Sequence, residues 1–283
     1  MSGMKKRENG KRLGNRRLFS MGLFGASVLF LLLVAVFGYV WQDAASVTDF
    51  SRKNLPPCAG YLFGTDWMGR DMLKRTVAGL SLSIRLGLLT AAISAAVALA
   101  LALLASLGGG LMDSLVCGLI NLVMGIPHML LLILISYIMQ PGMLTMIISM
   151  CVVGWLGMAR FIRNQIVIIR DRDYNLASRC LGTSTLRIIT RNLLPYLVSV
   201  ITLRMALAIP GAIGSEVFIT YIGLGLPVST PSLGNLINTG RKLISTSQSY
   251  QLVFPTIVLS IITISFYLIG NAFADAADPK NHV

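Results

Sequence analysis

Long apolar runs separated by short polar segments dominate the chain. The hydrocarbon core of a bilayer, about 30 Å thick, is crossed by about 20 apolar residues in a helix, and six runs come near that length. They lie at approximately 18–40, 81–107, 111–139, 143–169, 196–222 and 251–273. The pattern predicts an all-α membrane protein with six transmembrane helices.

A polar, arginine-rich segment at 170–195, here called the polar island, separates the fourth run from the fifth. Asp171 and Asp173 precede residues 174–181, and carboxylates suit the start of a helix because they complement its exposed amides and its dipole. Gly182 then provides a natural left-handed stop. A short helix that ends at Gly182 is therefore expected.

A second short helix is expected to follow, capped by Thr183 or Ser184. Pro195 cannot donate its amide, so it should bend or restart the helix where the chain returns to the membrane. The apolar stripe of this helix would be Leu186, Ile189 and Leu193, with Arg187, Thr190 and Arg191 facing away. On spacing alone two interpretations stay open: a surface for a cytoplasmic partner, or an interfacial helix pair whose arginines meet lipid phosphates.

The composition agrees with a bilayer protein. Hydrophobic residues make up 55% of the 283 residues and charged residues only 12%, which is far more apolar than a typical soluble domain. The net charge of +13 does not indicate a nucleic-acid binder, because such a protein needs a continuous basic stripe exposed to solvent. Here the basic residues lie between apolar runs, where membrane topology explains them.

The distribution of Lys and Arg predicts the orientation of the spans. The tail 1–17, the segment 160–191 and the C-terminal tail together carry fifteen, whereas the loops on the other side carry seven. This bias places both termini and the polar island in the cytoplasm. The first run follows a basic tail, as in a signal peptide, but it is longer than an ordinary signal core of ~7 to 15 residues. We therefore expect it to remain as an uncleaved first helix.

Two charged residues, Arg204 and Glu216, lie within the fifth run, where a charge is costly and usually faces a partner or a watery path. They are twelve residues apart, which is about 18 Å along a helix, so they cannot pair within it. Glu216 is expected either to make a structural hydrogen bond or to line the substrate path. Arg204 has the same two alternatives, with a carbonyl of another helix as its structural partner, and Arg85 can extend toward the outer interface.

Small residues and prolines give further signals within the runs. Alanines recur at three- and four-residue spacing at positions 91, 95, 98, 102 and 105, which predicts a close approach between membrane helices. Pro127 and Pro210 interrupt the helical ladder of the third and fifth runs, an interruption that membrane helices tolerate.

Several chemistries have no residues to support them in this chain. No G-x-x-x-x-G-K-[ST] segment occurs, so no nucleotide-binding P-loop is predicted, and no Ser/His/Asp or Cys/His grouping suggests covalent catalysis. The cysteines and histidines are scattered without metal spacing, at Cys58, Cys117, Cys151, Cys180, His128 and His282. We expect no catalytic residue, cofactor or metal here, and any ATP that drives the protein would be bound by another chain.

The polar island resembles the cytoplasmic loop of binding-protein-dependent ABC importer permeases, which carries a Glu-Ala-Ala triplet, then a glycine and, further on, a Leu-Pro pair. The residues in register with that motif are Ala177, Gly182, Leu194 and Pro195. Leu176 replaces the glutamate and Ser178 the second alanine. In that family the loop is a coupling helix seated in a groove of the ATPase subunit. The resemblance therefore implies that residues 173–195 contact an ATPase, through shape and the surrounding arginines more than through an acid.

Three further segments resemble permeases of the dipeptide, oligopeptide and nickel group. GTDWMGRD at 64–71 is similar to the signature that precedes their second span. YIGLGLPVSTPSLGN at 221–235 is similar to the loop after their fifth span, with Leu233 where a tryptophan is usual, and DAADP at 275–279 is similar to their C-terminal ending. Together these segments favour the second of the two paired permeases of such systems, the one with the short N-terminal region.

The resemblance implies the fold of a type I ABC importer permease. The chain would then divide into a cytoplasmic tail 1–17, a first helix 18–40, an extracytoplasmic loop 41–80, a core 81–275 with five spans and the coupling loop 170–195, and a cytoplasmic tail 276–283. The implied partners are a homologous second permease, two ABC ATPase subunits that bind ATP and Mg, an extracytoplasmic substrate-binding protein and the lipid bilayer, with no nucleic acid. The implied location is the cytoplasmic membrane of a bacterium or archaeon.

The function that this resemblance implies is ATP-driven import of di- or oligopeptides. Nickel or a metal chelate is the alternative substrate within the same family, because permeases with these signatures carry those as well. A rival from another class is an ion-coupled secondary transporter. It would use Glu216 and Arg204 as ion or proton sites and the polar island as an interfacial helix.

Overall fold

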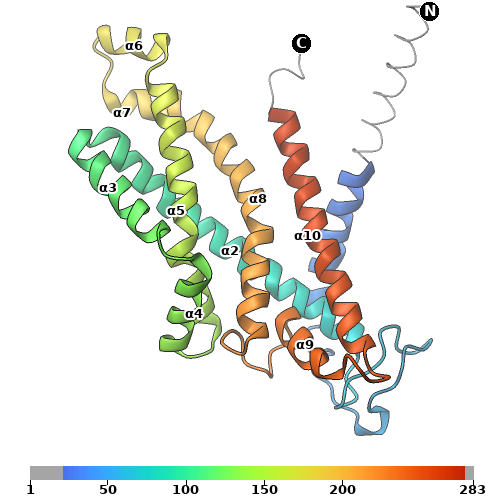
Figure 1. Cartoon of the computed structure of the whole chain (residues 1–283). Helices are drawn as coiled ribbons and strands as arrows, with labels where there is room; N and C mark the ends of the chain where they lie inside the picture. Colours follow the sequence, from blue (N-terminus) through green and yellow to red (C-terminus); the bar gives the residue numbers. More distant parts are fainter. Residues whose placement is uncertain (1–21, 278–283) are drawn as a thin grey trace, which may run out of the picture.

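The chain folds almost entirely into helices (Figure 1), in a computed structural model that describes residues 22–277. Within that range the regular structure is helical, apart from two isolated β-bridges. The basic tail 1–17, residues 18–21 of the first predicted span and residues 278–283 lie outside it. The long helices are Gly22–Val40, α2 (Met72–Leu107), α3 (Gly109–Met124), α4 (His128–Met139), α5 (Met143–Arg170), α8 (Leu194–Tyr221) and α10 (Tyr250–Ala277). The short ones are η1 (Phe50–Arg52), α6 (Asp173–Cys180), α7 (Thr185–Ile188), the π-helical turn η2 (Ile189–Leu193), α9 (Leu233–Gly240) and η3 (Arg241–Leu243).

Five of these helices are long and apolar enough to cross a membrane, and the number becomes six if α3 and α4 form one bent span. The predicted all-α membrane class is therefore confirmed. The predicted ends of the fourth, fifth and sixth runs agree closely with α5, α8 and α10.

The second helix differs from its prediction because it begins at Met72, nine residues before the apolar run at 81–107. Asp71 caps it, since its carboxylate accepts hydrogen bonds from the amides of Leu73 and Lys74. Arg75 in the first turn is buried by the preceding loop. The helix therefore extends past its apolar run, and its 36 residues span about 54 Å.

The third predicted span is broken rather than straight. α3 ends at Met124, α4 begins at His128, and the two helices are bent by 82°. Pro127 explains the break because it lacks an amide donor and disfavours the helical conformation at Ile126 before it. The interruption expected at Pro127 is thus confirmed as a sharp bend, whereas α8 continues through Pro210.

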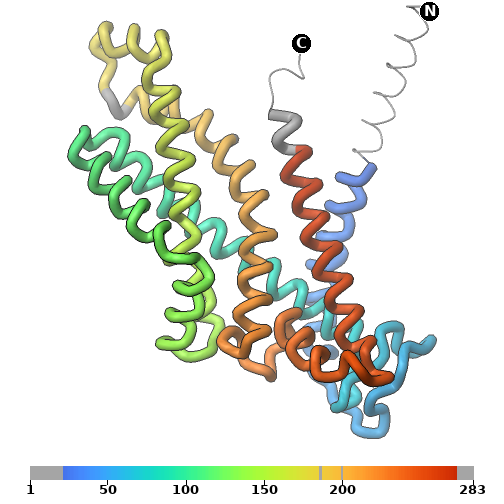
Figure 2. Tube along the Cα trace, viewed as in Figure 1, coloured from blue at the N-terminus to red at the C-terminus, as the bar shows by residue number. Residues whose placement is uncertain are grey.

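α2 lies at the centre of the molecule and packs against α5 and α8. The predicted alanine stripe is buried at Ala91, Ala95, Ala98, Ala102 and Ala105, which confirms its packing role. Figure 2 shows the first helix beside α10, and both contribute to one apolar cluster through Val34, Ile262 and Phe266.

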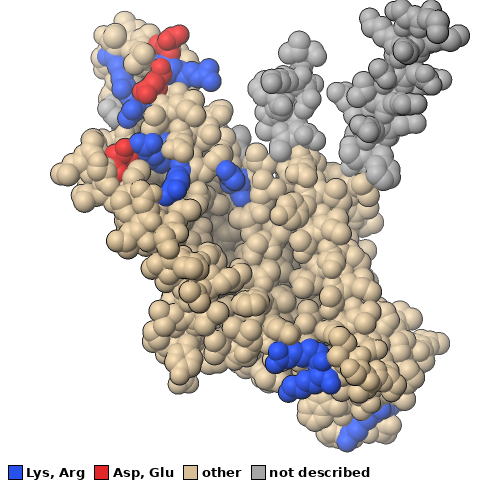
Figure 3. Space-filling model, viewed as in Figure 1, with Lys and Arg blue, Asp and Glu red and all other residues tan. Residues whose placement is uncertain are grey.

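The functional segments occupy two opposite ends of the molecule (Figure 1). One end, here called the α6 end, carries α6 and α7, and the first helix begins and α10 finishes on the same side. The other, the α9 end, carries α9 and the loop 41–71. In the view of Figure 3 the charged side chains gather toward these ends and leave a broad middle band without charge, as a membrane-embedded surface requires.

Candidate functional site

The first helix of the polar island ends as its sequence predicts. α6 finishes at Cys180, and Gly182 has a φ of +78°, in the left-handed region. The Gly182 amide donates to the Arg179 carbonyl at 2.9 Å and the Thr183 amide donates to the Ser178 carbonyl at 3.0 Å. These two bonds form a Schellman motif, which favours glycine because a side chain disfavours this φ.

The second part of the polar island differs from the expected separate helix. α7 runs through η2 directly into α8, and the Leu194 amide donates to the Ile189 carbonyl in the π-helical pattern. Pro195 is the second residue of α8 and directly follows this π-helical turn, and the helix does not restart there. The chain therefore returns to the membrane as one continuous helix that contains a single widened turn.

The exposed and buried faces of α7 and η2 are mostly as predicted. Arg187, Thr190 and Arg191 are exposed and Leu193 is buried, although Ile188, not Ile189, is the second buried apolar residue. The π-helical turn changes the register by about one residue, which explains the exchange. The Leu186 side chain lies outside the described residues.

α6 presents an apolar surface at the tip of the α6 end. Leu176 is 45% exposed, Leu181 just after the helix is 85% exposed, and Tyr174 and Ala177 are exposed as well. Ser178 is half-buried, and its hydroxyl donates to the Tyr174 carbonyl within the helix. Exposed apolar side chains gathered in this way are typical of an interaction surface.

Charges surround the junction between α5 and this tip. The side chain of Arg170 donates to the Asp171 carboxylate at 3.0 Å, which lowers the pKa of Asp171 below its usual value. A second nitrogen of Arg170 donates to the Ser106 carbonyl at the end of α2. Asp171 thus pairs with Arg170 and does not cap α6, whose N-terminal residue is Asp173.

The six residues predicted to contact an ATPase fall into two places. Leu176, Ala177 and Ser178 lie on α6, with Gly182 in the turn just beyond it. Leu194 is half-buried and Pro195 is exposed in the first turn of α8. The structure therefore brings four of the six together at the tip and leaves the Leu-Pro pair at the base.

Glu216 and Arg204 lie on α8 and do not pair with each other. The Glu216 carboxyl accepts hydrogen bonds from the hydroxyls of Ser83 on α2 and Thr220 on α8, at 2.6 and 3.1 Å. The Arg204 guanidinium stacks on Phe161 of α5, 3.8 Å from the ring centroid. Arg204 is also exposed, and its contact with the Phe161 ring takes the place of the carbonyl partner among the residues that the structure describes.

A hollow of about 260 Å³ lies between α2, α4, α5 and α8, and small or polar residues form much of its wall. It is lined by Thr90, Ala91, Ser94, His128, Met150, Gly154, Met158, Ala208, Gly211, Ala212 and Ser215. A second hollow of about 170 Å³ shares Gly154, Met158 and Ala208 with it and reaches Gly157, Arg204 and Leu207. Cβ atoms at Gly157 and Gly211 would meet open space, so close helix packing does not explain these two glycines.

This hollow is not among the features predicted from the sequence, although the sequence holds a signal for it. Ala208, Gly211, Ala212 and Ser215 have the spacing of one helical face. The structure shows that this small-residue face of α8 lies against open space as well as against other helices.

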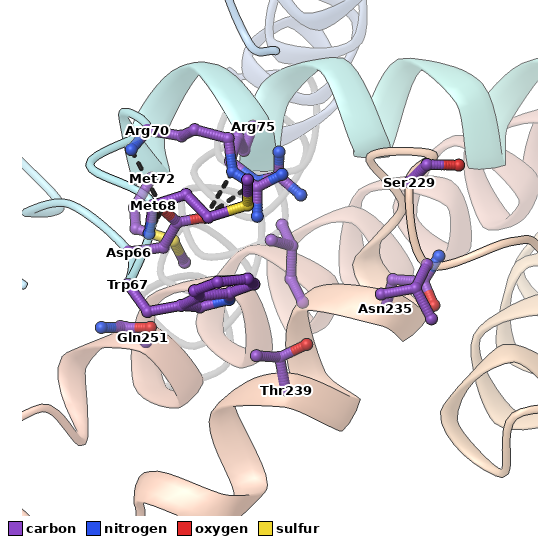
Figure 4. Close-up of a pocket in the computed structure, with 12 residues that line it drawn as sticks. Asp66, Trp67, Met68, Arg70, Met72, Arg75, Ser229, Asn235, Thr239 and Gln251 are labelled. Atoms are coloured by element: carbon purple, nitrogen blue, oxygen red, sulfur yellow. Dashed lines mark hydrogen bonds and ion pairs between the residues drawn. The ribbon is translucent and has the colours of Figure 1, made fainter. Parts of the chain in front are cut away.

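At the α9 end, the GTDWMGRD segment forms a tight scaffold around the buried Asp66 carboxylate. This carboxylate accepts from the Met68 and Arg70 amides at 2.9 and 3.0 Å and from the Arg70 side chain at 2.7 Å. Arg75 of α2 is buried beside it, with its Nε 3.7 Å from the Asp66 carboxylate. Figure 4 shows these side chains on one wall of a pocket of about 240 Å³, with Trp67 between them and Thr239 of α9.

Contacts with α10 fix the same scaffold in place. The Tyr250 hydroxyl donates to the Thr65 carbonyl at 2.8 Å, and the Phe63 and Phe254 rings stack with centroids 4.4 Å apart. Gly64 and Gly69 have φ values of +73° and +74°, so the two glycines of the signature supply left-handed turns. Within this chain the signature acts as a structural joint between the loop 41–71, α2 and α10.

The segment 221–235 forms a second joint at this end. The Asn235 side-chain amide donates to the Pro227 and Thr230 carbonyls at 2.8 and 3.0 Å, which holds the loop before α9. Leu233 is fully buried, so the leucine fills the position where a tryptophan was expected. Of the DAADP segment, residues 278 and 279 lie outside the described residues.

Comparisons with known proteins identify the family. Residues 95–283 match the family described as the binding-protein-dependent transport system inner membrane component. This chain belongs to that family. The match covers the polar island and the residues of α4, α5 and α8 that line the hollow, whereas the α2 residues of its wall, Thr90, Ala91 and Ser94, precede the matched range.

Several relatives from bacteria match this chain over most of its length. The dipeptide transport system permease protein DppC of Bacillus subtilis is 36% identical over 95% of this chain and 84% of its own. The oligopeptide transport system permease protein AmiD of Streptococcus pneumoniae is 33% identical over 93% and 85% of the two chains. The oligopeptide transport system permease protein OppC of Escherichia coli is 33% identical over 90% and 86%.

Solved structures agree with the fold. A chain of the MetNI methionine ABC transporter, in inward facing conformations, superposes with a TM-score of 0.57 over 71% of this chain and 97% of its own, at 17% identity. A chain of an amino acid ABC transporter solved with histidines gives the same score over 72% and 94%, also at 17% identity. This chain therefore has the fold of an ABC importer permease, as its sequence predicts.

Proposed function

We propose that this chain is one of two paired permeases in an ATP-driven importer, and that α6 docks it onto an ATPase subunit. The observation that carries this proposal is the apolar tip of α6, where Tyr174, Leu176 and Leu181 are exposed on a chain of this family. Leu176 stands where the family's motif has a glutamate, so its contact with the ATPase is apolar. The two ATPase subunits bind the ATP and Mg, and this chain contributes no nucleotide site.

The α6 end is the cytoplasmic end in this proposal. Support comes from the excess of Lys and Arg in the tail 1–17 and the segment 160–191 over the loops of the opposite end. Both termini then lie in the cytoplasm. The α9 end faces outward, where the GTDWMGRD scaffold and the exposed Trp67 form the surface that receives a substrate-binding protein.

The substrate path runs along the hollow between α2, α5 and α8, closed on its open side by the second permease. Small residues on α5 and α8 and open space at Gly157 and Gly211 support this placement. Arg204 lines the cytoplasmic half of the path, whereas Glu216 is a structural residue because both its oxygens accept hydroxyl donors. Transport follows alternating access, because nucleotide stabilises one of two states of the helices more than the other.

A peptide is the proposed substrate. The relatives from Bacillus, Streptococcus and Escherichia bear dipeptide or oligopeptide transport in their names, and this chain covers at least 84% of each. Nickel and metal chelates are the competing substrates, and an external binding protein contributes most of the selection among them.

Uptake by the reconstituted complex tests this proposal. The chain is placed in liposomes with its paired permease, its two ATPases and its binding protein, and entry of a labelled tripeptide is followed with and without ATP. Uptake is expected to require ATP and to stop with an ATPase variant that cannot hydrolyse it. Uptake that follows an imposed ion gradient and ignores ATP would instead favour an ion-coupled transporter, and uptake of nickel but not tripeptide would reject the peptide assignment.

A further inference from the structure

Asn175 is the one residue of α6 that is buried, and all eight residues of this helix are described. Its side chain is 0% exposed. Its amide nitrogen donates to the Ile169 carbonyl in the last turn of α5 at 2.7 Å, and its amide oxygen accepts from the side chain of Asn192 at 2.7 Å. One side chain therefore joins α6 to α5 on one side and to η2, which leads into α8, on the other.

These two bonds are difficult to replace. The last carbonyls of a helix lack partners within it, and the Ile169 carbonyl accepts from the Arg172 amide and from Asn175. Asparagine supplies a donor and an acceptor on one short side chain, which neither leucine nor aspartate does. Because Asn175 is buried, loss of either bond leaves its own amide nitrogen or amide oxygen without a protein partner and shielded from water.

The rest of α6 has little hold on the body of the protein. Its other side chains are exposed or half-exposed. The Asp171 side chain pairs with Arg170 at the surface, where an ion pair adds little rigidity. The chain connections at the two ends of α6 and the Asn175 side chain are therefore what hold it to the transmembrane helices.

The helices at the other ends of these bonds line the proposed path. α5 contributes Gly154 and Met158 to the hollow, and α8 contributes Ala208, Gly211 and Ser215. Asn192 lies in η2, and a single π-helical turn within a helix frequently marks a functional site. A shift of α6 thus reaches two walls of the hollow through one side chain.

We propose that Asn175 is the positioning residue that makes α6, the end of α5 and the start of α8 move as one unit when the ATPases close. This inference rests on the proposed docking of an ATPase on α6. Without the two bonds, α6 follows its ATPase while the path-lining helices lag behind it. ATP is then hydrolysed with little transport.

Three variants in the complete complex test this inference. Asn175→Leu removes both bonds at similar volume, Asn192→Leu removes only the bond toward α8, and Asn271→Leu is the control because it changes an exposed asparagine of α10. Each complex is measured for ATPase subunits retained on purification, ATP hydrolysis, and labelled tripeptide transported per ATP. We expect Asn175→Leu to keep its ATPases but lose about tenfold in tripeptide per ATP, within the usual range of coupling between sites. Asn192→Leu should lose less, and Asn271→Leu nothing.

A distance measurement separates positioning from a general loss of structure. Spin labels at exposed positions of α6 and α8, Arg179 and Val198, report whether the two helices move together in a cysteine-free background. In the wild type the distance should be the same with and without ATP. In Asn175→Leu it should change when ATP binds, whereas a merely structural role would alter it equally in both states.

The inference is overturned if Asn175→Leu transports as much tripeptide per ATP hydrolysed as the wild type. It is also overturned if ATP does not change the distance between the two spin labels in that variant. If Asn175→Leu does not assemble, Asn192→Leu decides, because it leaves Asn175 and its bond to α5 in place, and normal coupling there has the same meaning. A wild-type complex without ATP-dependent uptake contradicts the proposed function instead, independently of both variants.

Discussion

The carboxyl group of Glu216 on α8 accepts a hydrogen bond of 2.6 Å from the hydroxyl of Ser83 on α2. Both side chains are 0% exposed. The second carboxyl oxygen accepts from Thr220, and within residues 22–277 no ion pair involves Glu216. This acid therefore joins two helices through neutral donors, and these contacts favour the structural alternative among the two that its sequence left open.

Glu216→Gln should consequently transport tripeptide within about twofold of the wild type. The glutamine oxygen still accepts from Ser83, and its amide can donate to the Thr220 hydroxyl oxygen, so both side-chain contacts are kept with the direction of the second reversed. Glu216→Leu should destabilise the protein by about 1–3 kcal/mol, because it leaves both hydroxyls without their acceptor. Uptake by the three proteins, with their thermal unfolding in detergent, checks this. Complete loss of uptake in Glu216→Gln, with a normal unfolding temperature, would show that the acid carries ions or protons.

Gly69→Ala tests the scaffold at the α9 end. A Cβ at this position would overlap the Asp49 carbonyl, and the φ of +74° is unfavourable for alanine. We expect a loss of about 3 kcal/mol, the sum of the left-handed penalty and forced overpacking, with faster proteolysis of the loop 41–71. Gly60→Ala in the same loop is the matched control, because its Cβ meets open space. Equal proteolysis rates in the two variants would contradict the role assigned to Gly69.

Local signals in the sequence predicted the parts of the fold that local chemistry determines. Gly182 ends α6 because a left-handed residue is needed there and glycine provides it without strain. Pro127 breaks the third run for an equally local reason. The start of α2 was predicted too late because the apolar run does not set it. Asp71, which caps the helix, sets its start together with the burial of Arg75 by the preceding loop. Both depend on contacts outside the apolar run.

The site was less predictable than the fold because its geometry comes from residues far apart in sequence. Ser83 is 133 residues from Glu216, so nothing near Glu216 in the sequence shows its partner. Asn175 and Asn192 were unremarkable polar residues within the polar island until the structure brought them together. The absence of a separate second helix follows from η2, whose wider turn has no clear sequence signal.

A series at Gly182 tests the turn at the tip of α6. Gly182→Ala places a side chain at a φ of +78°, which costs about 1–2 kcal/mol, whereas Gly182→Asn should cost less because asparagine tolerates this conformation better. Gly182→Pro is incompatible with the φ and also removes the donor to the Arg179 carbonyl. We expect tripeptide transported per ATP to fall in the order Gly, Asn, Ala, Pro. Open space around the Cβ position excludes a steric clash as the cause, so an equal effect of all three substitutions would contradict the conformational argument.

Gly211→Val tests whether the hollow is the substrate path. A Cβ at Gly211 meets open space, and the methyl groups of a valine there would occupy part of a hollow of about 260 Å³. Crowding a passing peptide should raise the barrier to its passage, and uptake should fall roughly tenfold for each 1.4 kcal/mol of that increase. ATP hydrolysis in the absence of substrate should be unchanged, because the α6 surface proposed to contact the ATPase is untouched. Gly118→Val on α3 is the matched control, since its Cβ also meets open space but it lines neither hollow. If Gly211→Val transports a tripeptide at the wild-type rate, or if both variants lose uptake equally, the path lies elsewhere in the assembled complex.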